Sequence, residues 1–203
     1  SLKLIKRDEL ESDIGFKLKN KNLLITFHSV TLEEGSTNKQ FIELLAALRP
    51  LKETGLIFTL PNADTDGLVI IKLINEFVSN SLNSIVFKSL GQLHYLSCMS
   101  QMDGVIGNSS SGLLEAPSLK IPTINIGDRQ KGRLQASSII NCRPERPYIE
   151  KAIKKLYSKR FLVVLKKTIS PYGKGGASKK IVKIIKNLKS DGILKKQFFD
   201  LNQ

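Results

Sequence analysis

Small hydroxyl residues gather in the segment Gly107-Asn108-Ser109-Ser110-Ser111-Gly112. Glycine and serine between a strand and a helix let backbone N–H groups approach a phosphate closely, and the start of the helix adds partial positive charge. The same residues are common as ordinary N-caps of helices that bind nothing. The run is therefore interpreted either as an anion site, with Ser109 and Ser110 at a diphosphate, or as a plain helix cap.

A carboxylate follows this run, because Glu115 interrupts the apolar stretch Leu113-Leu114-Glu115-Ala116-Pro117. A carboxylate among apolar residues needs hydrogen-bond donors, and the vicinal hydroxyls of a ribose would supply two of them. A salt bridge to Arg129 or Arg133 is the alternative. Arg129 could instead offer its planar set of donors to phosphate oxygens.

His28 is the other ionisable group whose position suggests chemistry, because it directly follows a predicted strand. An imidazole there could bind a diphosphate or stabilise a departing nucleotide, although histidines at strand ends often have only a structural role. Polar residues also follow the next predicted strand, at Pro61-Asn62-Ala63-Asp64. In a parallel sheet these loops meet beyond the carboxyl ends of the strands, where ligands bind.

The elements that would position these residues are short buried strands alternating with longer amphipathic segments. This pattern is typical of a parallel sheet with helices on both faces. The predicted strands are 23–27, 55–60, 84–87, 104–106, 122–126 and 138–141. The predicted helices are 38–49, 66–79, 90–100, 111–119, 146–156 and 178–188. We therefore expect one Rossmann-like α/β domain over residues 21–203, preceded by a charged extension or hinge at residues 1–20.

The net charge of the chain, +14, resides in its last quarter. Residues 151–203 hold 15 Lys or Arg and 2 Asp, whereas residues 1–150 hold 17 basic and 16 acidic residues. Apolar residues recur at helical spacing over 181–188, which places most of the lysines there on the opposite, solvated face. Because no zinc-finger or aromatic RNA-binding motif accompanies them, these lysines do not predict a nucleic-acid partner.

Other sequence features bear on the compartment. No apolar run approaches the ~20 residues needed to cross a bilayer, and no signal-peptide pattern opens the chain. Cys98 and Cys142 show neither a pairing pattern nor a metal-ligand pattern, and we expect them to be packing residues in a reducing compartment. The expectation is a cytoplasmic protein that binds no membrane and carries neither a metal ion nor a cofactor.

Five short motifs, taken together and in order, resemble the hydrolysing UDP-N-acetylglucosamine 2-epimerases of sialic acid and capsule biosynthesis. They are Thr26-Phe27-His28-Ser29-Val30-Thr31, Pro61-Asn62-Ala63-Asp64, the run from Gly107 to Pro117, the run from Pro122 to Arg133, and Pro171-Tyr172-Gly173. The resemblance covers the chain from about residue 21 onward. It implies the C-terminal half of a GT-B-type two-domain fold, whose N-terminal domain would carry the carboxylates that handle the sugar C2 proton.

The resemblance also implies roles for residues of this sequence. The implied binding residues for UDP and sugar are Ser109, Ser110, Glu115, Arg129, Asn62 and Asp64, and the implied catalytic residue is His28. The serines would hold the diphosphate, the glutamate the ribose, the arginine and histidine the phosphate side, and the last two residues the sugar. Members of this family usually have proline where Ser29 follows His28, and serine would leave the histidine more mobile.

The implied reaction converts UDP-N-acetylglucosamine to N-acetylmannosamine and UDP by elimination followed by hydration. The 203-residue chain alone is expected to bind UDP without turning substrate over. Two alternatives remain open: a hydrolysing epimerase of UDP-linked diacetamido trideoxy sugars, and the donor domain of a GT-B UDP-sugar glycosyltransferase. The expected partners are UDP or its sugar conjugate and the N-terminal domain, and a homo-oligomer is left open.

Overall fold

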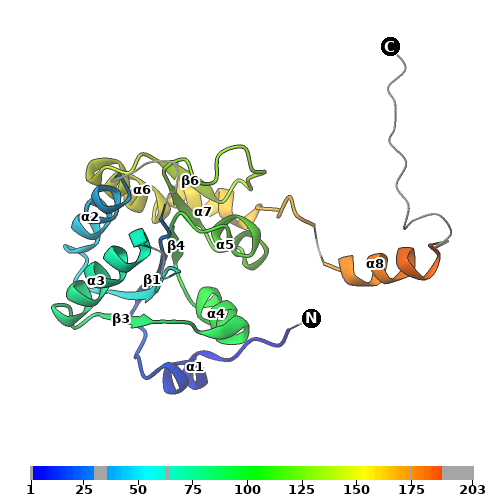
Figure 1. Cartoon of the computed structure of the whole chain (residues 1–203), viewed down its shortest axis with the longest axis horizontal. Helices are drawn as coiled ribbons and strands as arrows, with labels where there is room; N and C mark the ends of the chain where they lie inside the picture. Colours follow the sequence, from blue (N-terminus) through cyan, green and yellow to red (C-terminus); the bar gives the residue numbers. More distant parts are fainter. Residues whose placement is uncertain (1, 30–35, 63–64, 174, 189–203) are drawn as a thin grey trace, which may run out of the picture. The chain divides into compact units, whose positions relative to one another are not determined.

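The computed structural model describes residues 2–29, 36–62, 65–173 and 175–188 of the chain. Its centre is a six-stranded sheet in which every pair of neighbouring strands is parallel, in the order β3-β2-β1-β4-β5-β6 (Figure 1). The strands are β1 Lys21–Thr26, β2 Thr54–Thr59, β3 Ser84–Phe87, β4 Gly104–Gly107, β5 Thr123–Ile126 and β6 Ile139–Cys142. The predicted parallel Rossmann-like sheet is confirmed, and each predicted strand lies within two residues of an observed one.

Helices cover both faces of this sheet (Figure 1). In the first unit, Ser1–Tyr172, they are α1 Arg7–Ile14, α2 Ser36–Leu48, α3 Thr65–Ser79, α4 Gly91–Ser100, α5 Ser111–Leu114, the 3₁₀ helix η1 Ala116–Leu119, α6 Arg146–Leu156 and α7 Lys159–Lys166. A further helix, α8 Ala177–Lys186, belongs to the second unit. Alternate side chains of a strand point to opposite faces. Accordingly, Leu23 and Ile25 join the core formed with α2, α3 and α6, whereas Leu24 joins a second core formed with α1 and α4.

The first twenty residues pack against the domain through α1. Leu10 and Ile14 of this helix and Leu18 beyond it are buried in the second core. Gly15 ends the helix in the left-handed conformation, where its N–H bonds to helix carbonyl groups. The helix prediction from sequence missed α1, and the structure places these residues within a compact unit that runs from Ser1 to Tyr172.

The predicted helix 111–119 is wrong in part, because the structure divides it into two short pieces. Helix α5 makes a single turn, Glu115 joins the pieces, and η1 follows with Pro117 near its start. Proline has no N–H to donate to a carbonyl four residues earlier, so the α-helix cannot continue through it. A one-turn helix has few aligned peptide dipoles, so any anion site here depends on individual N–H and O–H groups.

The second unit, Gly173–Gln203, is described only through its helix α8. This helix has a strongly amphipathic sequence, and its apolar side chains are exposed, Ile181 by 54% and Ile184 by 62%. Within the described residues, no helix is both long enough and apolar enough to cross a membrane.

Candidate functional site

The strand order of the sheet reverses direction at β1, because β2 and β3 lie on one side of it and β4 to β6 on the other. In open parallel sheets the crevice at such a reversal, beyond the carboxyl ends of the strands, is where ligands bind. His28 follows β1 and Asn108 follows β4, so both lie at this crevice. The chemistry-bearing loops of the sequence thus converge where the topology predicts a ligand.

A cavity of about 720 Å³ opens at this edge. Its walls come from the ends of β1 and β2, from the segment that leads into α4, from α4 itself and from the serine run. The lining residues are Thr26, His28, Thr59, Leu60, Pro61, Asn62, Ile71, Lys88, Ser89, Leu90, Gly91, Gln92, Tyr95, Ser109 and Ser111.

The backbones of β1 and β4 approach each other closely beside the cavity. Gly107 has φ +141°, and a Cβ added to it would overlap the carbonyl oxygen of Thr26. Only glycine fits this position, because it has no Cβ and adopts positive φ readily. The glycine therefore lets the serine run start directly alongside the loop of His28.

Asn108 holds this loop through both polar atoms of its side chain. Its Oδ1 accepts a hydrogen bond from the backbone N–H of His28 at 2.7 Å, and its Nδ2 donates to the carbonyl of His28 at 2.9 Å. The asparagine is only 1% exposed, so these hydrogen bonds satisfy polar atoms that water cannot reach. His28 is half-buried and lines the cavity.

The loop after β5 is tied to the same asparagine. Arg129 Nη1 and Gln130 Nε2 donate to the carbonyl oxygen of Asn108, at 3.1 and 2.7 Å. Partial burial, and then the positive charge of Arg133, lower the pKa of Arg129. A nearby anion would stabilise the charged form of this guanidinium.

The serine run presents unused donors at the cavity. Among the residues that the structure describes, the backbone N–H groups of Ser109 and Ser110 donate to no acceptor. Ser110 lies at the N-cap position of α5, yet its side chain makes no capping hydrogen bond. The simple cap interpretation is therefore wrong for Ser110, and the free N–H groups are of the kind that bind phosphate.

Glu115 lies between α5 and η1 and is half-buried. Burial raises the pKa of its carboxyl group. Its Oε2 atom is buried without a hydrogen-bond partner, and within the described part of the chain it forms no salt bridge with Arg129 or Arg133. The ion-pair alternative for this carboxylate is thereby removed, and the side chain retains an acceptor without a donor.

The structure brings most of the predicted residues to one region. His28, Asn62 and Ser109 line the cavity itself. Ser110, Glu115 and Arg129 lie on the adjoining loops rather than in its lining, and Asp64 lies outside the described residues. The binding roles of these residues are predictions.

Sequence reasoning assigned no role to three further residues of the region, Asn108, Gln130 and Tyr95. Asn108 and Gln130 are each 1% exposed. Tyr95 lines the cavity and shares a hydrogen bond of 2.6 Å with Ser111. Asn108 carried the clearest signal, because a polar residue directly after a buried strand has to find partners inside the fold.

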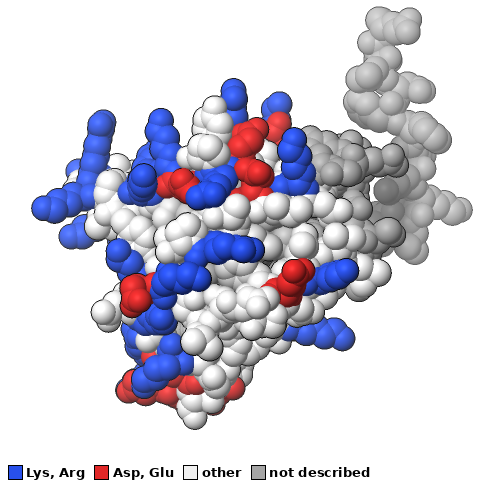
Figure 2. Space-filling view, turned by 90° about the vertical axis from the view of Figure 1, so that its left-hand side faces the viewer, with Lys and Arg blue, Asp and Glu red and all other residues white. Residues whose placement is uncertain are grey.

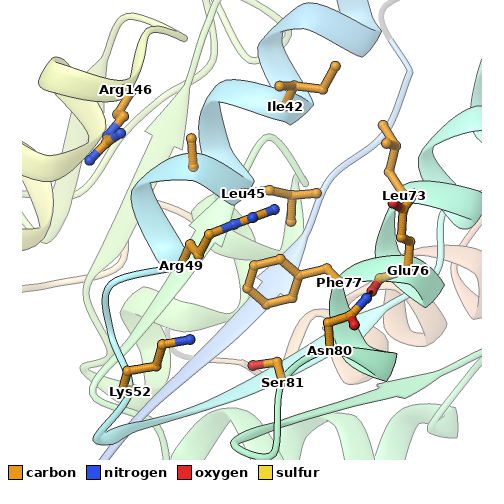
Figure 3. A pocket seen from close by; sticks show the side chains of 11 residues that line it. Ile42, Leu45, Arg49, Lys52, Leu73, Glu76, Phe77, Asn80, Ser81 and Arg146 are labelled. Carbon is orange, nitrogen blue, oxygen red and sulfur yellow. Dashed lines mark hydrogen bonds between the residues drawn. The ribbon is translucent and has the colours of Figure 1, made fainter.

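A separate cavity of about 570 Å³ lies between α2 and α3, and Figure 3 shows its apolar floor at Leu45 and Phe77 with Arg49 extending toward the phenylalanine ring. Lys52 and Ser81 belong to the loops that precede β2 and β3, at the amino ends of those strands. Figure 2, which views the side of α2 and α3, shows blue Lys and Arg spread among red Asp and Glu rather than in one patch. This cavity holds none of the motif residues.

The chain is similar to known proteins over almost its whole length. The family model described as UDP-N-acetylglucosamine 2-epimerase matches residues 2–186. The chain is 41% identical over 203 residues to a GDP/UDP-N,N'-diacetylbacillosamine 2-epimerase (hydrolyzing) of Campylobacter jejuni, covering 99% of this chain and 52% of the relative. It is 38% identical to the polysialic acid biosynthesis protein P7 of Escherichia coli, covering 99% and 51%.

A solved structure shows the same fold. The UDP-GlcNAc 2-epimerase of Neisseria meningitidis, bound to UDP-GlcNAc, superimposes with a TM-score of 0.65 at 22% identity, over 89% of this chain and 48% of that one. The neighbours of this kind have the GT-B-type fold, and the chain spans about half the length of the curated relatives it matches. On the family match over residues 2–186, the chain belongs to the UDP-N-acetylglucosamine 2-epimerase family.

Proposed function

We propose that this chain holds the UDP part of UDP-N-acetylglucosamine in a hydrolysing 2-epimerase. The reaction would begin with elimination of UDP across the C1–C2 bond of the sugar. Hydration of the resulting glycal would then give N-acetylmannosamine. In this scheme the chain binds the leaving nucleotide, and His28 stabilises the charge that develops on its phosphate.

The observation that carries the proposal is the set of donors at the crevice between β1 and β4. Two free N–H groups, those of Ser109 and Ser110, lie beside the loop of His28. Arg129 approaches from the loop after β5. These groups suit the oxygens of a diphosphate, which accept several hydrogen bonds at once.

Glu115 supports the nucleoside part of the proposal. Its buried Oε2 has no donor in the described structure, and a ribose would bring two hydroxyl groups. A carboxylate that receives such donors regains the hydrogen bonds that burial removes. The unpartnered oxygen is therefore consistent with a ligand that completes the site.

The catalytic carboxylates are expected on the other half of the enzyme. The chain matches only about half of the length of its relatives, and UDP would bind at the carboxyl edge of this half. We therefore propose that this chain alone binds UDP without turnover, and that it acts with an N-terminal domain.

A second candidate substrate is a UDP-linked diacetamido trideoxy sugar. The observation in its favour is the 41% identity to the Campylobacter jejuni enzyme, whose name gives diacetylbacillosamine as the sugar. Both candidates share the nucleotide, so they make the same prediction for UDP binding. They differ in the sugar released by the complete enzyme, which chromatography of the products would distinguish.

The test of nucleotide binding is a calorimetric titration of the 203-residue chain with UDP. Ser109→Ala and Glu115→Ala are each expected to weaken binding by about tenfold, because each removes a hydrogen bond to a charged or buried group. Glu76→Ala is the matched control, since this glutamate lines the α2–α3 cavity instead. Absence of any heat of binding at millimolar UDP, or an equal loss in the control, would contradict the proposal.

A further inference from the structure

A chain of three hydroxyl groups runs along one wall of the nucleotide cavity. Tyr95 of α4 lies 2.6 Å from the Oγ of Ser111, and Ser111 Oγ donates to Ser109 Oγ at 3.2 Å. The three side chains line or adjoin the same cavity as His28. The hydroxyl of Tyr95 is thus connected to Ser109 through a single intermediate residue.

The direction of the protons in this chain follows from counting donors. A serine hydroxyl has one proton and two lone pairs. Ser111 uses its proton on Ser109, so its hydrogen bond with Tyr95 requires the proton of the tyrosine. Tyr95 therefore donates to Ser111, and Ser111 donates to Ser109.

The hydroxyl proton of Ser109 is then the only proton of the three hydroxyl groups that has no acceptor among them. Its Oγ accepts from Ser111 Oγ and, at 3.4 Å, from the backbone N–H of Ser111, which occupies both lone pairs. In the described part of the chain the Ser109 hydroxyl donates to no acceptor. Its proton is free for an acceptor that enters the cavity.

Tyr95 is suited to a fixed role at the head of the chain. It stands on α4 just before Cys98 and Met99, which are buried in the second core. Burial raises the pKa of its hydroxyl above the ordinary value. A phenol with a raised pKa stays protonated at neutral pH and remains a donor.

We propose that Tyr95 is a positioning residue that orders the hydroxyl chain so that the Ser109 O–H points at the diphosphate. This inference rests on the proposed function, because it requires a diphosphate in the cavity. Without the tyrosine proton, Ser111 no longer has a fixed donor and the direction of the Ser109 hydroxyl is no longer set.

The test compares UDP with uridine, which lacks phosphate, as ligands of the wild-type chain and Tyr95→Phe. We expect UDP to bind roughly fivefold to tenfold more weakly to Tyr95→Phe, as for loss of one charge-assisted hydrogen bond. Uridine should bind both proteins equally. Equal loss for both ligands would mean that Tyr95 contacts the nucleoside or shapes the fold, and unchanged UDP affinity would also overturn the proposal.

A double-mutant cycle with Ser111→Ala tests whether the two residues act in one chain. Tyr95→Phe/Ser111→Ala should bind UDP about as tightly as whichever single variant has the lower affinity, because either change breaks the same sequence of hydrogen bonds. Additive losses would overturn the proposal. Ser111→Thr keeps the hydroxyl and should retain UDP affinity.

Tyr157→Phe is the matched control, since its buried hydroxyl has no hydrogen-bond partner in the described structure and lies outside the cavity. It should leave UDP binding unchanged. If the wild-type chain binds no UDP, the proposed function fails and this inference falls with it. If the wild type binds UDP and Tyr95→Phe binds it equally well, only the role of Tyr95 fails.

Discussion

At the scale of single residues, Glu115 is the group whose ionisation should report the ligand most directly. Burial raises its pKa above the ordinary value of 4.5. Ribose hydroxyls would donate hydrogen bonds to the ionised form and so lower that pKa again. Binding of UDP at the proposed site would therefore be linked to loss of the Glu115 proton.

We predict that UDP binding releases a proton from Glu115 at pH values between 4.5 and its raised pKa. The affinity for UDP should accordingly fall as the pH drops through this window, because the proton must first leave. Calorimetry in two buffers with different ionisation enthalpies measures the number of protons released on UDP binding. The part of the release due to this residue should vanish in Glu115→Gln, and an identical release in that variant would exclude the carboxyl group as its source.

The stability of the free chain should depend on pH with the opposite sign. A group whose pKa is higher in the folded state favours folding while it is protonated, and this contribution is lost as the pH rises through the folded pKa. Relative to Glu115→Gln, the wild-type chain should therefore lose stability as the pH rises, and bound UDP should reduce that loss.

At the scale of elements, α1 shows why a charged segment can still belong to a core. Five of its eight residues are charged, which masks the apolar pattern in the sequence. Leu10 is nevertheless fully buried, and Glu11 is held by Arg7, by Lys17 and by the backbone N–H of Leu18. The helix is thus joined to the second core by packing and by an ion-pair cluster.

We predict that Leu10→Ala lowers the free energy of unfolding by about 2–5 kcal/mol, as for other large-to-small changes in a core. Urea denaturation followed by circular dichroism measures the change. Leu2→Ala, at a leucine that is 50% exposed, should have little effect. A small effect of Leu10→Ala would instead mean that residues 1–20 are a loosely attached extension.

The sequence predicted the strands well because buried parallel strands leave a short apolar run between polar loops, as at Thr54–Thr59. It missed α1 and also α7, which is only eight residues long and has a basic sequence. For the candidate site, the sequence predicted that the motif loops meet at one edge of the sheet, and His28, Asn62 and Ser109 do line one cavity there. The hydrogen bonds of Asn108 could not, because its partner His28 is 80 positions away and becomes a neighbour only through the strand order.

At the scale of the whole molecule, the structure divides the chain into Ser1–Tyr172 and Gly173–Gln203. All residues that line the nucleotide cavity belong to the first unit. The second unit carries eight of the 15 Lys or Arg residues of the last quarter of the sequence, all of them lysines. The proposed nucleotide site and these eight lysines therefore belong to different units of the chain.

We predict that a chain ending at Tyr172 binds UDP as tightly as the 203-residue chain. Its affinity should agree within about twofold, because every lining residue is kept. Calorimetry with UDP measures the affinity of both proteins. A chain that ends at Leu156 serves as the comparison: it also lacks Phe161 of the first core, and it should therefore have a lower free energy of unfolding. If the chain that ends at Tyr172 did not bind UDP, residues beyond Tyr172 would have to take part in the site.

The position of Asn108 has a consequence for the affinity of the site. Its side chain fixes the backbone of His28, and its carbonyl fixes Arg129 and Gln130. The three loops are therefore ordered when the chain folds, before any nucleotide arrives. Ordering loops at the moment of binding opposes association, so preorganisation of this kind leaves more of the contact energy for holding the ligand.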